Sequence, residues 1–206
     1  ANVTVVDLTA FDLLGLTLTG NLSVSSGGSI TQSGALTVSG TSTFTLTTGT
    51  TDILLPLANS FGNTITFTDN GNIRDLSFQK SAGAAAFPVI PAGLPILRDL
   101  TVVWNSGFTM PSVAVSGVMS LSGGTAVTQA AGGIQADSLL LLGAGPYTLT
   151  DPANNVTTLA ANTTGGIAYR DAAALTVGTV LGTNGIASGG SDVSLQTGTT
   201  LGISQA

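Results

Sequence analysis

The side chains in this sequence that could take part in chemistry are few, and most of them are aspartates. All ten acidic residues are aspartate, and the only basic residues are Arg74, Lys80, Arg98 and Arg170. The chain has no histidine and no cysteine, which excludes Ser-His-Asp and Cys-His catalysis, thiolate metal sites and disulfides. Paired carboxylates remain as a possible catalytic arrangement, and such pairs cleave glycosidic bonds in many polysaccharide-degrading enzymes.

Two pairs of aspartates are close enough in sequence to be considered as acid–base pairs. Asp7 and Asp12 lie five residues apart, and Asp69 and Asp75 lie six apart. Aspartates in sequences such as "TDPANN" (150–155) also fit Asx-type turns, in which the carboxylate accepts a hydrogen bond from a nearby backbone N–H. Few basic residues and few aromatic residues favour the turn role. We therefore predict no catalytic residues and no enzyme activity, with a carbohydrate-active β-helix enzyme using paired aspartates as the alternative.

Calcium is the metal that suits a chain whose acidic ligands are all carboxylates. The calcium-binding solenoid repeat G-G-x-G-x-D-x-U-x is absent, and "GGSDVSLQTG" (189–198) is similar to it only distantly. Asp192 is therefore a weak candidate for a metal ligand, and the start of a strand is its other possible role. We predict no cofactor.

Three of the four basic residues directly precede an aspartate. These pairs are Arg74-Asp75, Arg98-Asp99 and Arg170-Asp171. Adjacent residues of a strand point to opposite faces, so we expect that no pair bridges itself, and pairing of arginine and aspartate on different coils is the alternative. We interpret the three pairs as positional repeats rather than as a ligand site.

The composition predicts an all-β protein. Only 7% of the residues are charged, against roughly 25% in ordinary globular chains, yet 43% are hydrophobic. Threonine and valine, which favour strands, are abundant, while lysine and glutamate are nearly absent. The net charge of −6 and the lack of clustered basic residues exclude nucleic acid and disfavour an anionic membrane surface. The longest apolar stretch (82–97) contains three prolines and is too short for a membrane span.

A repeat of 97 residues runs through the sequence. The segment "LTLTGNLSVSSGGSITQ" (16–32) matches "VAVSGVMSLSGGTAVTQ" (113–129) without a gap (113 − 16 = 97). The matched positions are Leu16 and Val113, Leu18 and Val115, Leu22 and Met119, Val24 and Leu121, Ile30 and Val127, and Gln32 and Gln129. A third, looser copy begins in "DVSLQTGTTLGISQA" (192–206).

Within each copy, short runs of alternating apolar and Ser/Thr residues are separated by glycine and asparagine turns, as in "LTLTGNLSV". Such strands fit either a parallel β-solenoid or a β-sandwich. Repetition and low charge favour the solenoid, because stacking equivalent positions about 4.8 Å apart penalises like charges. We predict coils of about 20 to 25 residues. The positions predicted to face inward are Leu16, Leu18, Leu22, Val24, Ile30, Leu36, Val38, Val113, Val115, Met119, Leu121 and Val127.

The repeats divide the chain into four segments. We predict that residues 1–78 form the first solenoid copy, 112–190 the second, and 191–206 the start of a third. Residues 79–111 contain the only tryptophan, and we expect an irregular excursion or a distorted coil there.

Several stretches, among them "GALTVSGTSTFTLTTG" and "VTTLAANTTGGIAYRDAAALTVGTV", resemble the β-strand repeats of large bacterial exoproteins. These are the filamentous-haemagglutinin-like adhesins of two-partner secretion systems. The resemblance implies a right-handed parallel β-helix that forms the shaft of an extracellular surface filament. The NPNG- or NPNL-type signature of that family's secretion domain is absent, so the resemblance implies a shaft segment without catalytic residues.

We therefore expect a structural and adhesive module at the cell surface. Its expected partners are further coils, either in a longer chain or in a second copy stacked end to end, and possible host or neighbouring-cell surfaces. We also expect that the large apolar side chains of the excursion make lateral contacts. These are Phe87, Ile90, Leu94, Trp104 and Phe108.

A surface- or ice-binding solenoid is a further alternative, because flat rows of threonine can perform that function. T-x-T runs begin at residues 17, 43, 45, 64 and 66 but do not recur at one coil spacing. The sequence therefore favours the adhesive module.

Overall fold

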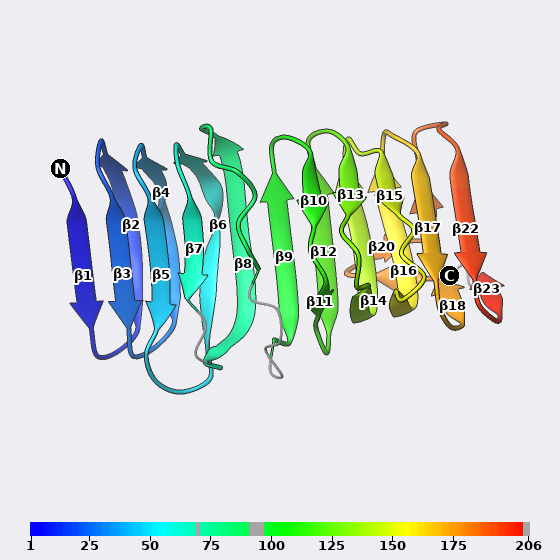
Figure 1. The fold of residues 1–206 in the computed structure, drawn as a ribbon, viewed down its shortest axis with the longest axis horizontal. Coiled ribbons are helices and arrows are strands. Elements are labelled where there is room, and N and C mark those ends of the chain that lie inside the picture. Colours follow the sequence, from blue (N-terminus) through cyan, green and yellow to red (C-terminus); the bar gives the residue numbers. More distant parts are fainter. Residues whose placement is uncertain (69–70, 91–96, 204–206) are drawn as a thin grey trace. The chain divides into compact units, whose positions relative to one another are not determined.

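A computed structural model describes residues 1–68, 71–90 and 97–203. All regular secondary structure in these residues is β-strand. The strands make about eight turns of a parallel β-solenoid (Figure 1). Among the described strands, only β19 and β20 pair antiparallel. The predicted β-helix is thereby confirmed, and the β-sandwich alternative is wrong. The chain divides into two compact units, Ala1–Asp99 and Leu100–Ala206.

Unit 1 consists of coils that each contribute one strand to each of two sheets. Its strands are β1 (Val3–Asp7), β2 (Phe11–Leu18), β3 (Leu22–Ser26), β4 (Ile30–Val38), β5 (Ser42–Leu46), β6 (Thr51–Phe61), β7 (Ile65–Thr68) and β8 (Ile73–Ala82). The odd-numbered strands form one parallel sheet, in the order β1-β3-β5-β7. The even-numbered strands stack in the order β2-β4-β6-β8 behind them (Figure 1).

The coils of unit 1 differ in length. Val3 pairs with Leu22, Leu22 with Ser42, and Ser42 with Ile65. Successive coils therefore take 19, 20 and 23 residues (22 − 3, 42 − 22 and 65 − 42). The extra residues of the third coil lie between Leu46 and Ile53, in the turn after β5 and at the start of β6, and beyond them β6 keeps a constant register with β4. These lengths are close to the predicted range.

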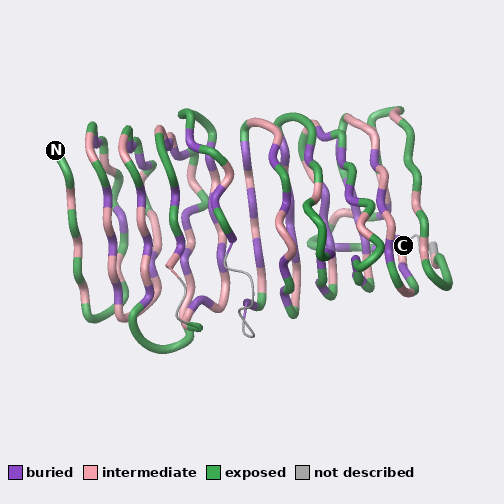
Figure 2. Tube along the Cα trace, viewed as in Figure 1, coloured by how far each residue is buried: buried purple, intermediate pink, exposed green. Residues whose placement is uncertain are grey.

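Along the strands of unit 1, buried residues alternate with more exposed ones (Figure 2), and the buried apolar residues form the core. Among the positions predicted to face inward, Leu16 is partly exposed. The others in this unit are buried, namely Leu18, Leu22, Val24, Ile30, Leu36 and Val38. Three phenylalanines also pack together inside: the rings of Phe44 and Phe67, on successive coils, stack with centroids 5.9 Å apart, and Phe78 of the same coil as Phe67 packs tilted against it at 5.1 Å.

A glycine corner precedes the first sheet strand in successive coils. A Cβ atom added to Gly40 would lie 2.2 Å from Oδ1 of Asn21 and 2.5 Å from the carbonyl oxygen of Gly20. The corners approach closely because Oδ1 of Asn21 accepts a hydrogen bond from the backbone N–H of Thr41 at 2.9 Å, one coil further on. Glycine is required here by close approach rather than by its backbone freedom.

Unit 2 is built in the same way from shorter strands. They are β9 (Asp99–Trp104), β10 (Phe108–Met110), β11 (Val113–Ala114), β12 (Val118–Gly123), β13 (Val127–Gln129), β14 (Ile134–Gly143), β15 (Tyr147–Leu149), β16 (Asn155–Thr163), β17 (Ile167–Asp171), β18 (Leu175–Val177), β19 (Thr179–Val180), β20 (Thr183–Asn184), β21 (Ile186–Ala187), β22 (Val193–Thr197) and β23 (Leu201–Ile203). One parallel stack runs β9-β12-β14-β16-β18-β23, and the other runs β10-β13-β15-β17-β22. The positions predicted to face inward in this unit are all buried, namely Val113, Val115, Met119, Leu121 and Val127.

A hairpin interrupts the last coils of unit 2. Strands β19 and β20 pair through Val180 and Thr183 around the two-residue turn Leu181-Gly182. Both turn residues have positive φ, 48° and 82°, as the tight turns of two-residue hairpins require. The inserted residues lengthen this coil to 26 residues, measured from Ile167 to its partner Val193 (193 − 167).

Candidate functional site

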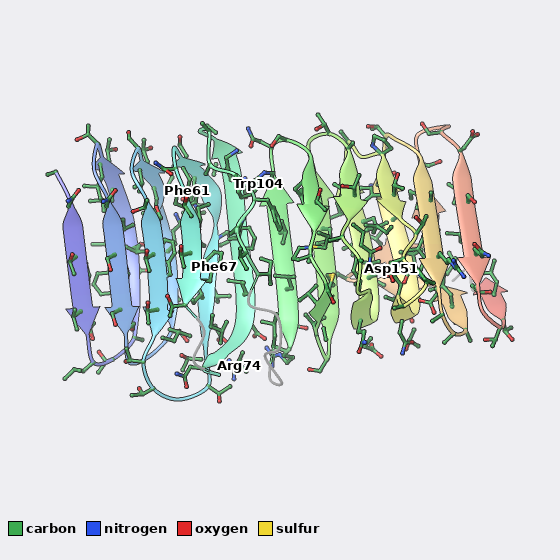
Figure 3. All side chains as sticks on the ribbon, in the orientation of Figure 1. Phe61, Phe67, Arg74, Trp104 and Asp151 are labelled. Carbon is green, nitrogen blue, oxygen red and sulfur yellow. The ribbon has the colours of Figure 1, made fainter. Side chains whose placement is uncertain are left out.

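The charged side chains of unit 1 form a ladder between neighbouring coils. Arg74 on β8 donates two hydrogen bonds to Asp52 on β6, from Nε to Oδ1 at 2.9 Å and from Nη2 to Oδ2 at 2.7 Å. Arg98 donates to Asp75 in the same way, through Nε at 3.0 Å and through Nη2. These hydrogen bonds, together with the charges of the carboxylates, raise the pKa of both guanidinium groups. Arginine and aspartate thus pair between coils, which the sequence left open as an alternative, and Figure 3 labels Arg74.

Adjacent residues also meet in this ladder, which the sequence did not predict. Nε of Arg98 lies 3.0 Å from Oδ2 of Asp99, and Nε of Arg74 lies 3.8 Å from Oδ2 of Asp75. The expectation that no pair bridges itself was therefore wrong. In β8, Arg74 and Asp75 lie on the same side because the register of β8 against β6 shifts at this point. One extra residue in β8 leaves both side chains partly exposed.

Three other aspartates form Asx turns at the ends of strands. Oδ1 of Asp7, Asp151 and Asp171 accepts a hydrogen bond from the backbone N–H two residues further on, at 2.7, 2.8 and 2.8 Å. The hydroxyl and backbone N–H of Thr9 lower the pKa of Asp7. The predicted turn role is confirmed for Asp151, which Figure 3 labels.

The aspartate pairs considered for catalysis are engaged in other contacts. Asp12 accepts hydrogen bonds from the hydroxyls of Thr31, at 2.9 Å, and Ser33, at 2.5 Å. Asp75 binds Arg98 as described above, and Asp69 lies outside the described residues. These contacts hold neighbouring coils or turns together, and they give no observation in favour of an acid–base pair.

Asp171 is the buried aspartate of unit 2, with 1% of its surface exposed. Its Oδ2 accepts hydrogen bonds from the backbone N–H of Val156 and from the hydroxyl of Tyr169, both at 2.8 Å. Burial, and then the hydrogen bond to Asp171 and its charge, raise the pKa of the Tyr169 hydroxyl. Burial likewise raises the pKa of Tyr147 to about 12. The carboxylate therefore has a structural role, since its hydrogen bonds join neighbouring coils.

Asp192, the weak candidate for a metal ligand, is exposed and directly precedes β22. Its carbonyl oxygen accepts a hydrogen bond from the backbone N–H of Ile167 at 2.9 Å, which continues the parallel pairing of β17 and β22. Within residues 1–68, 71–90 and 97–203, no three acidic side chains gather into a group that could hold a metal ion.

The most extensive polar contacts inside unit 1 belong to a buried asparagine. Asn59 and Gln32, on neighbouring coils, exchange hydrogen bonds through their side-chain amides. Oδ1 of Asn59 also accepts from the backbone N–H of Leu36 at 2.8 Å, and Nδ2 donates to the carbonyl oxygens of Leu55 and Gln79 at 3.3 and 3.2 Å. One side chain thus ties together three successive coils.

Unit 2 contains the same arrangement. Nε2 of Gln129 donates to Oδ1 of Asn154 at 2.5 Å, and Nδ2 of Asn154 donates back to Oε1 at 3.1 Å. Asn154 also accepts from the backbone N–H of Ile134 at 2.7 Å, and donates to the carbonyl oxygens of Leu149 and Arg170 at 3.1 and 3.0 Å. The sequence repeat aligned the two glutamines but not their asparagine partners.

The side chains predicted to make lateral contacts have different environments. Ile90, Trp104 and Phe108 are buried, with 0%, 2% and 6% exposed, so the expectation that they form an exposed group was wrong. Trp104 is buried because it continues the inward alternation of β9 after Leu100 and Val102. Leu94 lies outside the described residues.

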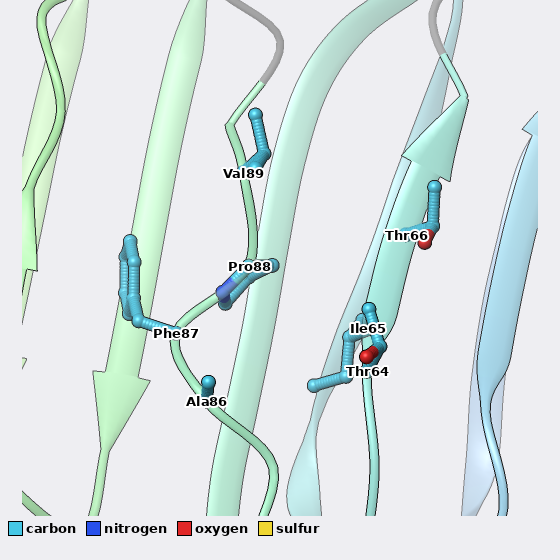
Figure 4. Close-up of a pocket in the computed structure, with 7 residues that line it drawn as sticks. All are labelled: Thr64, Ile65, Thr66, Ala86, Phe87, Pro88 and Val89. Atoms are coloured by element: carbon cyan, nitrogen blue, oxygen red, sulfur yellow. The ribbon is translucent and has the colours of Figure 1, made fainter.

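Phe87, the remaining member of that group, is partly exposed and lines a small hollow (Figure 4). The hollow has a volume of about 180 Å³ and lies between β7 and residues 86–89. These two segments are joined by a single bridge between Thr66 and Val89, and Val89 is 81% exposed. The hollow is therefore a gap where the sheet of β7 is not continued by a full strand.

Comparisons with known proteins place the chain in a family without a known activity. No curated protein and no solved structure matches the chain. In the described residues, no helix is long and apolar enough to cross a membrane. A family model, "Repeats of unknown function (DUF5649)", matches residues 1–68 and 97–161, which together make up more than half of the chain. The two matched segments begin 96 residues apart (97 − 1), close to the spacing of the internal repeat, and the chain belongs to this DUF5649 repeat family.

Proposed function

We propose that this chain is a structural and adhesive module of an extracellular bacterial surface filament. The observation that carries the proposal is how the polar side chains are used. Asn59 and Asn154, the Arg74–Asp52 pair and Asp171 all hold neighbouring coils together. A module whose polar groups are engaged in stacking its own coils is suited to building length rather than to turning over a substrate.

Self-association or continuation in a longer chain is the expected mode of assembly. The first coil offers the apolar surface that such stacking needs, since a hollow of about 270 Å³ opens among Val3, Val5, Phe11 and Leu13. A further parallel coil of the same repeat would cover these side chains and pair with the free edges of β1 and β2.

Surface exposure can be tested with an antibody raised against the folded module. We expect it to label intact cells of the source bacterium, and beads coated with the module to adhere to neighbouring or host cells. Labelling only after the cells are lysed would contradict the extracellular role. Surface labelling without any adhesion of the beads would restrict the role to the shaft.

End-to-end assembly can be tested by sedimentation velocity of the purified chain over a wide concentration range. We expect association that increases with concentration and is weakened by Val5→Asp, which places a charge in the apolar hollow. Thr4→Asp changes the neighbouring, outward position of β1 and is the matched control. A monomer at every concentration would rule out assembly by separate copies and leave continuation in a longer chain.

A further inference from the structure

The outward side chains of β1, β3, β5 and β7 form two straight rows. The first row is Thr4, Ser23, Thr43 and Thr66, and the second is Val6, Ser25, Thr45 and Thr68. Each member is the direct pairing partner of the next. Because paired strands lie about 4.8 Å apart and residues i and i+2 lie about 6.7 Å apart, the rows form a regular two-dimensional lattice. We call these eight positions the hydroxyl face.

The hydroxyls of this face are available to a partner outside the chain. Within the part of the chain that the structure describes, none of the seven hydroxyls donates or accepts a hydrogen bond with another protein group. In unit 2, by contrast, the stacked Thr109 and Thr128 hydroxyls bind each other at 2.9 Å. Ser23, Ser25, Thr43 and Thr45 are only partly exposed, because neighbours above and below restrict them. The hydroxyls are therefore held in regular positions and are free to bind a partner outside the chain.

The inner side of the same strands adds to this order. The rings of Phe44 and Phe67 stack directly beneath the outward threonines of β5 and β7, with centroids 5.9 Å apart. Packed aromatic side chains that repeat from coil to coil fix the strand separation, and with it the spacing of the hydroxyls.

The chemistry of the face selects among flat partners. It carries no charged side chain, so it cannot bind a phosphate backbone or a charged surface through ion pairs. It carries no aromatic side chain either, and sugar rings are commonly bound by stacking on exposed aromatic rings. What remains is a regular array of hydroxyl and methyl groups, whose spacings are close to the oxygen repeats of ordinary ice.

We propose that the hydroxyl face binds ice. The hydroxyls would take up positions of the water lattice at a crystal surface, and the threonine methyl groups would hold the intervening water in place. This inference does not depend on the filament role, because it concerns a face of unit 1 that coil stacking leaves uncovered.

The test is inhibition of ice recrystallisation by the purified chain, together with partition of a fluorescently labelled sample into a growing ice crystal. Thr45→Tyr places a bulky side chain in the middle of the lattice. Thr37→Tyr makes the same change at an exposed position of β4, in the other sheet, and is the matched control. We expect Thr45→Tyr to raise the concentration for half-maximal inhibition by at least about tenfold, equivalent to about 1.4 kcal/mol.

Circular dichroism of both variants would verify that the fold is retained. The proposal is overturned if the unaltered chain neither inhibits recrystallisation nor enters the ice. It is also overturned if the folded Thr45→Tyr variant is as active as the unaltered chain, or if Thr37→Tyr causes an equal loss.

Discussion

The two units bury alternate side chains in the same way, but two of their outer faces, one in each unit, differ in composition. In unit 1 the outward positions of β3, β5 and β7 are serine and threonine, and they remain uncovered. In unit 2 the stacked outward positions of β14 and β16 include Leu140 and Ala160, which are buried under Val180 of the β19–β20 hairpin. The comparison shows that the apolar outward positions of β14 and β16 are covered by the hairpin, whereas the serine and threonine positions of β3, β5 and β7 need no such cover.

The largest effect should come from placing a charge beneath the hairpin. Leu140→Asp puts a carboxylate among Ala160, Val180 and Leu142, and we expect it to lower the free energy of unfolding by about 4 kcal/mol. Thr45→Asp makes the corresponding change on the hydroxyl face and should cost about 1 kcal/mol or less. Urea unfolding followed by circular dichroism would measure both. Similar losses would show that the two outer faces do not differ as described.

The two buried asparagines, Asn59 and Asn154, allow a second comparison of the units. Because they make equivalent hydrogen bonds, replacing either one should reduce stability by a similar amount. Asn59→Ala and Asn154→Ala each remove the hydrogen bonds to a partly buried glutamine amide and leave the backbone N–H of a buried residue, Leu36 or Ile134, without its side-chain acceptor. We expect each to cost about 3 kcal/mol. The matched control is Asn162→Ala, on an exposed position of β16, with an expected change within about 0.5 kcal/mol. A large loss in only one unit would mean that the shared geometry is not a shared source of stability.

Alkaline pH should affect the stability of the two units differently. Both tyrosines, Tyr147 and Tyr169, lie in unit 2, and burial raises the pKa of each above its ordinary value. A raised pKa contributes stability that is fully present below about pH 10, where the unfolded tyrosine is still neutral, and is lost as the pH rises towards the folded pKa. We expect unit 2 to lose about 2 to 3 kcal/mol at pH 11.

Unit 1 should not lose stability by this route. It has no tyrosine, and burial lowers the pKa of its Lys80, which makes stability rise with pH until the unfolded lysine is also neutral. Trp104 fluorescence reports on unit 2, and hydrogen exchange resolved by peptide would follow both units between pH 8 and pH 11. Tyr147→Phe and Tyr169→Phe should each reduce the slope for unit 2. Parallel loss of protection in both units would contradict the assignment.

The smallest expected effect is a gain in stability. The hydroxyl of Ser42 is buried and, among the described residues, has no hydrogen-bond partner. Removing an unsatisfied buried hydroxyl should be favourable, so we expect Ser42→Ala to stabilise the protein by about 1 kcal/mol. Ser23→Ala changes a hydroxyl on the outer face of β3 and should have almost no effect. Thermal unfolding of the two variants would reveal the difference, and a clear loss in Ser42→Ala would point to an unrecognised partner.

The inward positions could be predicted from the sequence because alternation alone decides which side chains a strand buries. The rows of the hydroxyl face could not, because coils of 19, 20 and 23 residues give them no constant period. Asn59 and Asn154 were missed for the same reason, since they lie 95 residues apart (154 − 59) in a repeat of 97.

Two other sequence-based predictions were wrong for local reasons. An extra residue in β8 leaves Arg74 and Asp75 both partly exposed, and no pattern of residue types announces such a shift. Trp104 was treated as part of an irregular segment because of the prolines nearby, although its own alternation with Leu100 and Val102 already indicated a buried strand.

The variable length of the coils makes the solenoid a scaffold for foreign sequence. The segment between Leu46 and Ile53 already holds extra residues while β6 keeps a constant register with β4, and Gly49 within it has φ of +68° with open space where a Cβ atom would lie. A peptide epitope grafted at this turn would project from the molecule, while the register of β5 and β6 remains set by their own neighbours. The same tolerance means that a loop at this turn can change in length while the coils on either side keep their pairing.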